Sequence, residues 1–143
     1  MRAVWPADRP LVVRISASDW LEGRGFTLDE AVEFARWLKA DGCDLIDVST
    51  AGNSPESKPD YGRMYQVPFA ERIRCEADLP VMAVGGLQGV DHVHTIVAAG
   101  RADLGAIARG FLADPYMVQR EANRREIADY PWPPQYLAAQ TVR

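Results

Sequence analysis

The sequence contains few of the residues on which disulfide-stabilised and metal-binding proteins depend. Only two cysteines, Cys43 and Cys75, and two histidines, His92 and His94, occur among 143 residues, and no C-x-x-C pair is present. Isolated cysteines of this kind are typical of thiols inside a core, so we predict that both are buried. The histidines are two positions apart, about 200° around a helix, which disfavours a shared metal site. We therefore expect no metal centre.

Long apolar runs and clusters of positive charge are also missing. The longest apolar stretches, such as LPVMAVGGL, fall well short of the roughly 20 residues that cross a bilayer. The first residues, MRAVWPADRP, have no apolar segment of the kind found in a signal peptide. The formal net charge is -4, and no run of Lys or Arg is present. We therefore expect no nucleic-acid partner, no membrane partner and a cytoplasmic location.

What the sequence does contain is a strand pattern followed by a helix pattern. The stretch PLVVRISASDW holds a short β-branched run after Pro10, which is typical of a buried parallel strand. In TLDEAVEFARWLKADG, Thr27 and Glu30 have the spacing of a capping box and the apolar residues follow helical spacing. Gly42 provides a stop. We therefore predict a strand in LVVRIS and a helix between Thr27 and Gly42.

The same pattern repeats three more times along the chain. Strands are predicted in CDLIDVST, LPVMAVGG and ADLGAIAR, and helices in MYQVPFAERIRCEA, GVDHVHTIVAAG and DPYMVQREANRREIA. In the last helix we expect Asp114 at the N-cap and Pro115 at the first helical position, because both residues favour those places. Four consecutive βα units with short connections imply parallel strands and right-handed crossovers.

Two architectures accommodate four such units: an open doubly wound sheet and one half of an eight-stranded (β/α)8 barrel. A doubly wound nucleotide-binding sheet predicts a G-x-G-x-x-G fingerprint after the first strand. ISASDWLEGRG lacks it, since Gly23 and Gly25 come too late. The barrel predicts phosphate-binding loops after its last two strands, where VGGL and ARGF stand. We therefore predict an α/β fold for residues 1–143: half of a (β/α)8 TIM barrel with parallel strands.

Glycines and an arginine follow the third and fourth predicted strands. Gly85 and Gly86 close one strand, and Ala108, Arg109 and Gly110 close the next. Glycine lets backbone N–H groups approach a phosphate closely, and arginine adds a permanently charged, bidentate donor. A parallel sheet brings neighbouring strand ends together, so these residues predict a phosphate site. The alternative is that the glycines only form tight turns and that the arginine is solvated.

An arginine lies inside the first predicted strand, where apolar residues are expected. An unpaired cation is costly to bury, so Arg14 must reach a carboxylate or face a ligand at the mouth of the sheet. Asp47 occupies the corresponding place in the next strand. A structural Arg14–Asp47 pair and a cation aimed at an electron-rich ligand edge are therefore both compatible with the sequence.

Five motifs, in this order, resemble the C-terminal half of the old yellow enzyme family, the NADH:flavin oxidoreductases: VVRISASDW, LKADGCDLIDVSTAG, AVGGL, GRADLGAIARGFLADPY and PPQY. The resemblance spans nearly the whole chain, and residues 100–115 are its most specific part. The chain is most similar to the subgroup that contains xenobiotic reductases and the flavin half of bifunctional acyl-CoA oxygenase/reductases. The resemblance implies a (β/α)8 barrel to which this chain contributes strands five to eight.

The resemblance also implies FMN as cofactor, NAD(P)H as reductant and an enone-type small molecule as substrate. Arg14 corresponds to the family arginine at the flavin pyrimidine edge, where a cation stabilises negative charge on the reduced ring. Gly85 and Gly86 correspond to the phosphate loop after the seventh strand, and Ala108 and Arg109 to a Gly-Arg pair after the eighth. Alanine in place of that glycine is compatible with phosphate binding if the backbone there needs no positive φ.

The chain departs from the family pattern towards both of its ends. PPQY is followed by Leu137 and Ala138, where relatives carry an arginine that reaches a neighbouring subunit's site. The family's catalytic His/His or His/Asn pair and its tyrosine proton donor come from the N-terminal half, so we expect no catalytic residue in this chain. RAVWP resembles the end of the helix before the fifth strand, which indicates a fragment or one half of a split barrel.

Three functions follow from these observations. The first is the FMN-phosphate-holding portion of a flavin oxidoreductase, catalytically incomplete alone, whose partner is the missing N-terminal half or another chain. The second is a non-catalytic half-barrel whose exposed strand edges pair with a partner chain or a second copy, giving a homo-oligomer. The third is another phosphate-binding barrel enzyme, which is disfavoured because a generic phosphate site gives no reason for Arg14.

Overall fold

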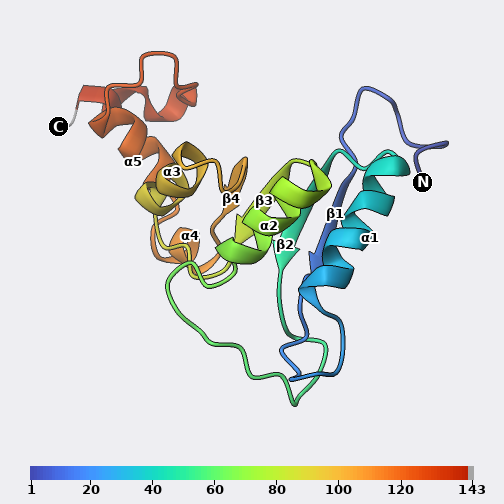
Figure 1. The fold of residues 1–143 in the computed structure, drawn as a ribbon. Helices are drawn as coiled ribbons and strands as arrows, with labels where there is room; N and C mark the ends of the chain where they lie inside the picture. Colours follow the sequence, from blue (N-terminus) through green and yellow to red (C-terminus); the bar gives the residue numbers. More distant parts are fainter. Residues whose placement is uncertain (142–143) are drawn as a thin grey trace.

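Four parallel strands form the centre of the protein (Figure 1). The computed structural model describes residues 1–141. The strands are β1 (Val12–Ser16), β2 (Leu45–Ser49), β3 (Val81–Val84) and β4 (Leu104–Ala106), and they lie in the sheet in the order β1-β2-β3-β4. Each strand therefore pairs with its neighbour in the sequence, as the repeated βα pattern predicts.

Helices alternate with these strands. They are α1 (Leu28–Ala40), α2 (Val67–Ala77), α3 (Val90–Ala98), α4 (Arg109–Ala113) and α5 (Met117–Arg124), followed by a 3-10 helix, η1 (Pro134–Thr141). The capping box at the start of α1 is present, because Glu30 N donates to Thr27 Oγ1 and Thr27 N donates to Glu30 Oε2. Of the helices within residues 1–141, none combines the length and the apolarity that a membrane crossing requires.

One face of the sheet is buried beneath the helices. Ile46, Val48, Val81 and Ala83, which point to this face from β2 and β3, are completely buried. They belong to one core cluster that includes residues of α1, α2 and α3: Ala31, Val32, Ala35, Val67, Ala70, Ile73, Ala77 and Ile96. Figure 1 shows α2 lying across β2 and β3, and α1 alongside β1. The alternation of buried residues in the strands therefore identifies the helix-covered face.

The described residues leave the opposite face of the sheet open. Val12 is 46% exposed and Leu104 is 51% exposed, and both point to this face together with Arg14. A doubly wound sheet has helices on both faces, whereas the wall of a (β/α)8 barrel has helices on the outside only. Sequential strand order and one-sided helices therefore confirm the α/β fold of a partial TIM barrel.

Hydrogen-bonded carboxylates join the elements at the amino-terminal end of the sheet. Asp103 accepts from Val81 N at 2.9 Å and from both Nε and Nη2 of Arg74 at 3.0 Å. Asp44 accepts from Leu11 N at 2.7 Å and pairs with Arg2. These contacts link the start of each strand to the next strand or to a helix, so they hold the βα units in register.

Two local predictions are wrong. Asp114 is not the N-cap of the last helix: it is the C-cap of the short helix α4, and α5 begins after Tyr116, with Met117 N bonded to Asp114 O at 3.2 Å. Pro115 therefore lies in the turn between two helices. Cys43 is buried as predicted, but Cys75 is exposed. Cys75 is two positions beyond the buried Ile73, which places it about 200° around α2, on the solvent side.

Candidate functional site

The Gly85–Gly86 turn, which follows β3, adopts a backbone that only glycine accommodates. The φ values are +93° at Gly85 and +67° at Gly86. A Cβ on Gly86 would lie 2.6 Å from Met64 N, and a Cβ on Gly85 would lie 2.7 Å from Cδ of Gln66. Both glycines are therefore required by conformation and by space, and both are half-buried.

The neighbouring strand end, which holds Ala108 and Arg109, lies beside this turn. Val84 and Ala106 are paired in the sheet, so Gly86 and Ala108 are both two residues beyond that pair. Ala108 has φ -101°, which lies outside the left-handed region that favours glycine. The alanine at this position, where the resemblance implies a glycine, is therefore compatible with the backbone N–H that the predicted phosphate site needs.

At the two strand ends, several backbone N–H groups have no acceptor among the described residues. Within residues 1–141, no hydrogen bond uses the N–H of Gly85, Gly86, Ala108 or Arg109. Backbone N–H groups are strong donors and are almost always paired when they are shielded from water. Four unused donors on adjacent strand ends therefore form a surface that suits an anion with several acceptor oxygens.

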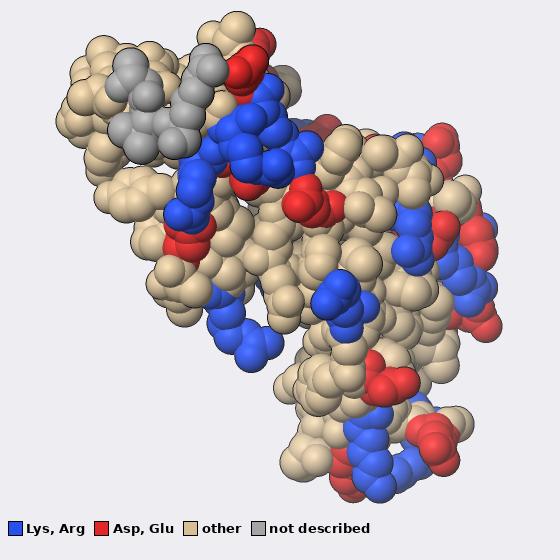
Figure 2. Space-filling view, turned by 90° about the vertical axis from the view of Figure 1, so that its left-hand side faces the viewer, with Lys and Arg blue, Asp and Glu red and all other residues tan. Residues whose placement is uncertain are grey.

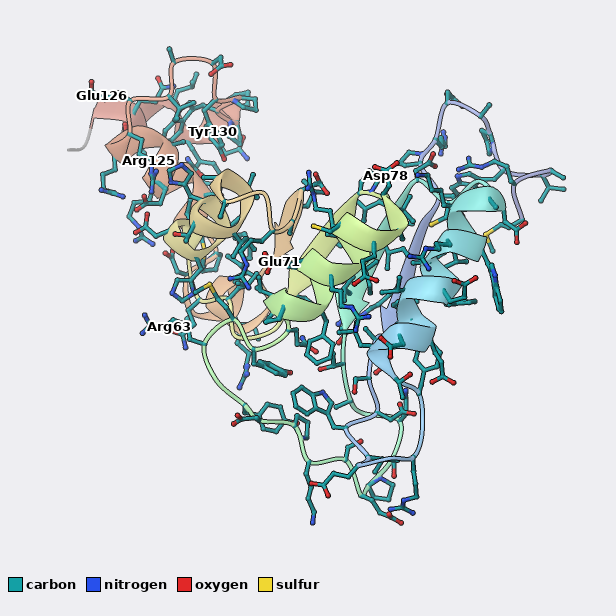
Figure 3. The ribbon with its side chains drawn as sticks, in the orientation of Figure 1. Arg63, Glu71, Asp78, Arg125, Glu126 and Tyr130 are labelled. Carbon is teal, nitrogen blue, oxygen red and sulfur yellow. The ribbon has the colours of Figure 1, made fainter. Side chains whose placement is uncertain are left out.

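Two arginines without a carboxylate partner among residues 1–141, Arg63 and Arg109, lie near the glycine turn. Among residues 1–141, the basic side chains without a carboxylate partner are Arg9, Lys58, Arg63 and Arg109. Burial raises the pKa of Tyr65, and the charge of Arg109 acts in the opposite direction, which places Arg109 near Tyr65. Figure 3 shows Arg63 projecting from the loop that leads into α2. The ends of β3 and β4, which we call the strand-end site, therefore carry positive charge that no carboxylate of residues 1–141 pairs with.

Elsewhere on the surface many charges are paired. Figure 2 shows several places on one face of the molecule where Lys or Arg lies beside Asp or Glu, with uncharged residues between these places. Such pairs include Arg101 with Glu71 at 2.7 Å, and Arg125 with Asp91. Paired charges attract a distant anion weakly, because their fields cancel over a few ångströms. Unpaired arginines beside the glycine turn are therefore the more effective anion contacts.

Gln66 lies directly behind the glycine turn and is buried, with 2% of its surface exposed. Its Oε1 accepts from Thr50 N and, at 2.7 Å, from Thr50 Oγ1, while its Nε2 donates to Val84 O at 2.9 Å. The side chain therefore joins the carboxyl end of β2 to that of β3. Neither Gln66 nor Arg63 is recognisable from the sequence, because no spacing or turn signal connects residues in the β2–α2 loop to Gly85.

Arg14 lies on the open face of the sheet and pairs with Asp47. Arg14 Nη1 is 3.1 Å from Asp47 Oδ2, and the two residues are directly opposite in the β1–β2 register. The side chain of Asp47 is 10% exposed and that of Arg14 is 58% exposed. Asp47 Oδ1 is buried without a hydrogen-bond partner among the described residues. The structural pair is thus formed, and the guanidinium still has donors that face the open side.

The loops after β1 and β2 are joined into one wall at the same end of the sheet. Asp19 accepts from Phe26 N at 2.7 Å and from Asn53 Nδ2 at 2.8 Å, and these two bonds lower its pKa. Arg24 pairs with Glu56 at 2.8 Å across the two loops. A hollow of about 730 Å³ lies on this wall. The hollow is lined in part by Trp20, whose Nε1 has no partner among the described residues, and by Lys58.

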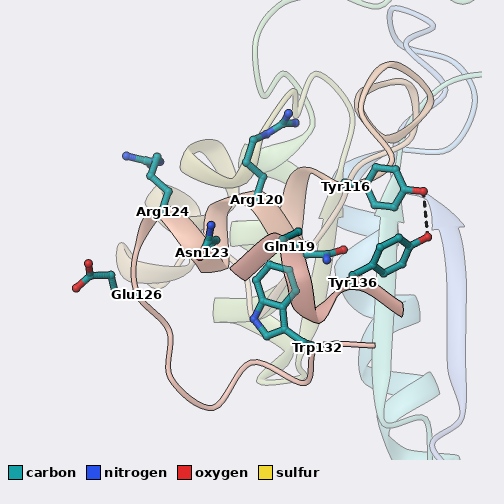
Figure 4. A pocket seen from close by; sticks show the side chains of 9 residues that line it. Tyr116, Gln119, Arg120, Asn123, Arg124, Glu126, Trp132 and Tyr136 are labelled. Carbon is teal, nitrogen blue, oxygen red and sulfur yellow. Dashed lines mark hydrogen bonds between the residues drawn. The ribbon is translucent and has the colours of Figure 1, made fainter. Parts of the chain in front are cut away.

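A second hollow lies over the C-terminal segment, far along the chain from the glycine turn. It measures about 710 Å³ and is lined mainly by α5, Trp132 and η1 (Figure 4). The hydroxyls of Tyr116 and Tyr136 meet at 3.1 Å beside it. Leu137, which stands where relatives carry an arginine, is 51% exposed. This hollow contains none of the predicted site residues.

No cluster of three or more His, Cys, Asp or Glu side chains that could hold a metal ion occurs in the described part of the chain. The predicted site residues fall instead into two groups. Gly85, Gly86, Ala108 and Arg109 come together at the ends of β3 and β4, whereas Arg14 lies on β1, two strands from β3. A ligand that contacts both groups must extend across the carboxyl end of the sheet.

Comparison with known proteins reveals clear relatives. Residues 2–127 match the NADH:flavin oxidoreductase / NADH oxidase family. The chain is 40% identical over 122 residues to an NADPH dehydrogenase of Listeria innocua, 37% identical over 134 residues to one of Clostridium acetobutylicum, and 39% identical over 136 residues to one of Bacillus subtilis. These alignments cover 85%, 93% and 95% of this chain, and 35%, 39% and 39% of the relatives.

A solved structure shows the same fold. The complex of 2-naphthoyl-CoA reductase with 2-naphthoyl-CoA superposes with a TM-score of 0.70 at 25% identity. The superposition covers 82% of this chain and 18% of that chain. The chain therefore spans well under half of the length of the relatives and of the structure that it matches.

Proposed function

Because this chain belongs to the NADH:flavin oxidoreductase / NADH oxidase family, we propose that it is the FMN-phosphate-holding part of an NAD(P)H-dependent flavin oxidoreductase. Gly85, Gly86, Ala108 and Arg109 hold the phosphate, and Arg14 contacts the polar edge of the flavin ring. When bound, FMN supplies two-electron transfer between NAD(P)H and an activated C=C bond. The residues of this chain bind and orient the cofactor.

One observation carries the proposal: the backbone donors of Gly85, Gly86, Ala108 and Arg109, which no described residue accepts from, follow two adjacent strands, and Arg109 has no carboxylate partner among residues 1–141. A phosphate monoester has three terminal oxygens, each of which accepts more than one hydrogen bond. Four N–H groups and a guanidinium match this demand without any rearrangement. The residues present therefore fit the phosphate group of FMN.

Arg14 fits the second contact. Asp47 holds its guanidinium by one nitrogen, so the remaining N–H groups stay available on the open face of the sheet. A cation fixed by a buried carboxylate is preorganised, and a preorganised cation stabilises developing negative charge with little reorganisation. Arg14 therefore supplies electrostatic stabilisation at the flavin edge, while the Gly85–Gly86 turn supplies anchoring.

The missing part of the enzyme supplies the rest of the site. We propose that β1 to β4 are the fifth to eighth strands of a (β/α)8 barrel, since the barrel family places phosphate loops after its last two strands. The relatives are more than twice as long as the matched region, which supports this assignment. The catalytic pair and proton donor then come from the N-terminal half or from a partner chain.

The substrate proposal is an electron-poor unsaturated compound. The matched relatives are named NADPH dehydrogenases, and the matched structure is named 2-naphthoyl-CoA reductase. Both names describe reductive chemistry, and the second describes a substrate whose ring is conjugated to a thioester carbonyl. Within the family we assign the chain to the xenobiotic-reductase-like subgroup, with an enone-type or related acyl substrate.

A second function, assembly without catalysis, is favoured by one observation. The open sheet face and the free edges of β1 and β4 would both be covered if a second copy completed an eight-stranded barrel. Sedimentation of the purified chain separates the two cases. A stable monomer contradicts this function, and a dimer that excludes FMN supports it. The family match argues against the third function, an unrelated phosphate-binding barrel.

The test of the phosphate site is an NMR titration of the isotope-labelled chain with inorganic phosphate, FMN and riboflavin. Riboflavin is the matched control, because it has the ring of FMN but no phosphate. We expect phosphate and FMN to shift the amide signals of Gly85, Gly86, Ala108 and Arg109, and riboflavin to leave them unchanged. The proposal fails if phosphate shifts none of the four, or if riboflavin shifts them equally.

A second experiment tests the incomplete catalysis. This chain is co-purified with the amino-terminal half of the Bacillus subtilis relative, which we propose to be the part that this chain lacks. We expect flavin absorbance and NADPH oxidation in the complex, and neither activity nor tight flavin binding in the chain alone. A purified complex without bound flavin would contradict the assignment of this chain to the cofactor-holding half.

A further inference from the structure

The side-chain amide of Gln66 links the strand end before the glycine turn to Thr50. Its Nε2 donates to Val84 O at 2.9 Å, and its Oε1 accepts from Thr50 N and Thr50 Oγ1, with Ser49 Oγ at 3.4 Å. Gln66 is buried, with only 2% of its surface exposed. Both ends of the amide are therefore used, and the amide has one possible orientation.

The bond from Gln66 to Val84 fixes the direction of a neighbouring donor. In a trans peptide the C=O of one residue and the N–H of the next point in opposite directions. Val84 O points towards Gln66, so the N–H of Gly85 points away from it. The N–H of Gly85 is among the donors that no described residue accepts from. Gln66 thus determines where this donor is aimed.

The carbonyl of Gly86, two residues further on, is held in the same way. Met64 N donates to Gly86 O at 3.3 Å, which turns the following N–H, that of Leu87, to the opposite side. Gln66 and Met64 belong to one loop, two residues apart, and this loop packs behind Gly85 and Gly86. The loop before α2 therefore binds the carbonyls of Val84 and Gly86, and the N–H groups that follow them, those of Gly85 and Leu87, point away from this loop.

From this geometry we propose that Gln66 is a positioning residue for the anion site: it holds the Val84–Gly85 peptide so that the Gly85 N–H faces the bound phosphate. The inference rests on the proposed function of the site. Glutamine is suited to this place because it accepts from Thr50 and donates to Val84 O at once. A glutamate carboxylate at this position could also accept from Thr50. It could not donate to Val84 O, so two oxygen acceptors would face each other.

The substitution Gln66→Glu tests this role through its pH dependence. At about pH 8 the introduced carboxylate has no proton for Val84 O, so we expect phosphate to bind roughly tenfold more weakly than to the wild-type chain, the loss of one well-aligned donor. At about pH 5 burial keeps the introduced carboxyl protonated, and its O–H can donate. The ratio of mutant to wild-type affinity then returns to within about threefold.

Inorganic phosphate is the probe, and the Gly85 amide signal is the readout. Ile73→Val is the matched control, because it alters a completely buried residue of α2 that is not bonded to the turn. We expect this control to lower stability without changing the affinity for phosphate at either pH. A deficit in Gln66→Glu that is equal at both pH values, or absent at both, overturns the inference.

A further variant covers the case in which Gln66→Glu does not fold. Gln66→Met keeps the length of the side chain and adds no charge, but it donates to nothing. We expect weaker phosphate binding, by about threefold to tenfold, with no recovery at low pH. Wild-type affinity in a folded Gln66→Met chain contradicts the positioning role. If the wild-type chain itself binds no phosphate, the proposed function fails instead, so the two failures are distinguishable.

Discussion

At the amino-terminal end of the sheet, Asp44 and Asp103 are paired with arginines and with the N–H groups that begin the adjacent strands. At the carboxyl end, the corresponding N–H groups after β3 and β4 are unused and Arg109 has no carboxylate partner within residues 1–141. Figure 3 shows the two ends of α2: Asp78 follows the helix on the amino-terminal side of the sheet, and Arg63 precedes it on the carboxyl side. Polar groups of the same types are thus satisfied at one end and left available at the other.

The difference teaches how one sheet separates stability from binding. Charged pairs that satisfy each other add to the free energy of folding but offer little to a ligand. Donors left without partners cost stability in the absence of a ligand and gain it when an anion binds. In (β/α)8 barrels the two ends of the strands divide the same two tasks. Substitutions at the two ends should therefore have different effects, and four experiments test this.

The largest effect is expected for Gly86→Ala at the carboxyl end. The new Cβ would lie 2.6 Å from Met64 N at a φ of +67°, so we expect a loss of roughly 3 kcal/mol of unfolding free energy and no phosphate binding. Gly52→Ala is the matched control, since Gly52 has a φ of +88° but no atom within 4 Å. It should lose about 1 kcal/mol in urea denaturation and keep phosphate binding. Equal behaviour of the two variants would remove the steric argument.

The next largest effect is expected for Arg109→Ala, compared with Arg74→Ala at the other end. Arg109 has no partner to lose, so its removal should weaken phosphate binding by about tenfold and leave the urea midpoint unchanged. Removal of Arg74 breaks its bonds to Asp103 and should lower the midpoint without affecting binding. Calorimetric titration and urea denaturation of both variants give the comparison. A drop in stability for Arg109→Ala would show that this arginine is structural.

A smaller effect concerns the pH dependence of stability. The hydrogen bonds from Arg74 hold the pKa of Asp103 below its usual value, and the bond from Val81 N adds to this. A carboxyl whose pKa is lower in the folded protein stabilises the fold at pH values above its pKa in the unfolded chain, about 4. This stabilisation is lost as the pH falls through its pKa in the folded protein. Asp103→Asn should therefore lower the unfolding free energy by about 1 kcal/mol at neutral pH. The difference should shrink below about pH 4, and a constant difference would contradict the assignment.

The smallest effect is expected for Arg63→Ala. Arg63 is exposed and unpaired within the described chain, so its charge acts on the anion through solvent. We expect phosphate to bind about threefold more weakly at low salt, with no difference at roughly 0.5 M salt, where the Debye length is only a few ångströms. Arg9→Ala removes another unpaired arginine, at the amino-terminal end, and should change nothing. Equal effects of the two would indicate net charge alone.

The regular parts of the fold were predictable because local signals agree with it. The capping box of Thr27 and Glu30 follows from residue type and spacing alone. Asp114 misled because a proline next to an aspartate looks like a helix start, whereas the preceding residues already form α4. Competition between two adjacent helix starts is decided by packing, which the sequence pattern does not contain.

The candidate site was predictable only in its first layer. Glycines and an arginine that directly follow predicted strands can be recognised in the sequence. The Arg14–Asp47 pair can be recognised too, because the two residues occupy corresponding positions in neighbouring strands. Gln66 carries none, because its role depends on contacts to Thr50 and Val84, which are 16 and 18 residues away. A buried polar side chain that bridges two loops is visible only once the loops are placed.

Sequential strand order has a consequence for how this protein reaches its folded state. Every strand pairs with the strand that precedes or follows it, but each pairing spans a whole helix, as the partners Val13 and Ile46 show. Parallel pairing of this kind must close a long loop before its contacts form, so it is intrinsically slow. The glycine turn is held by Gln66, which also bonds to Thr50 beyond the end of β2. We therefore expect the turn to acquire its binding geometry late in folding, after β2 has paired with β3.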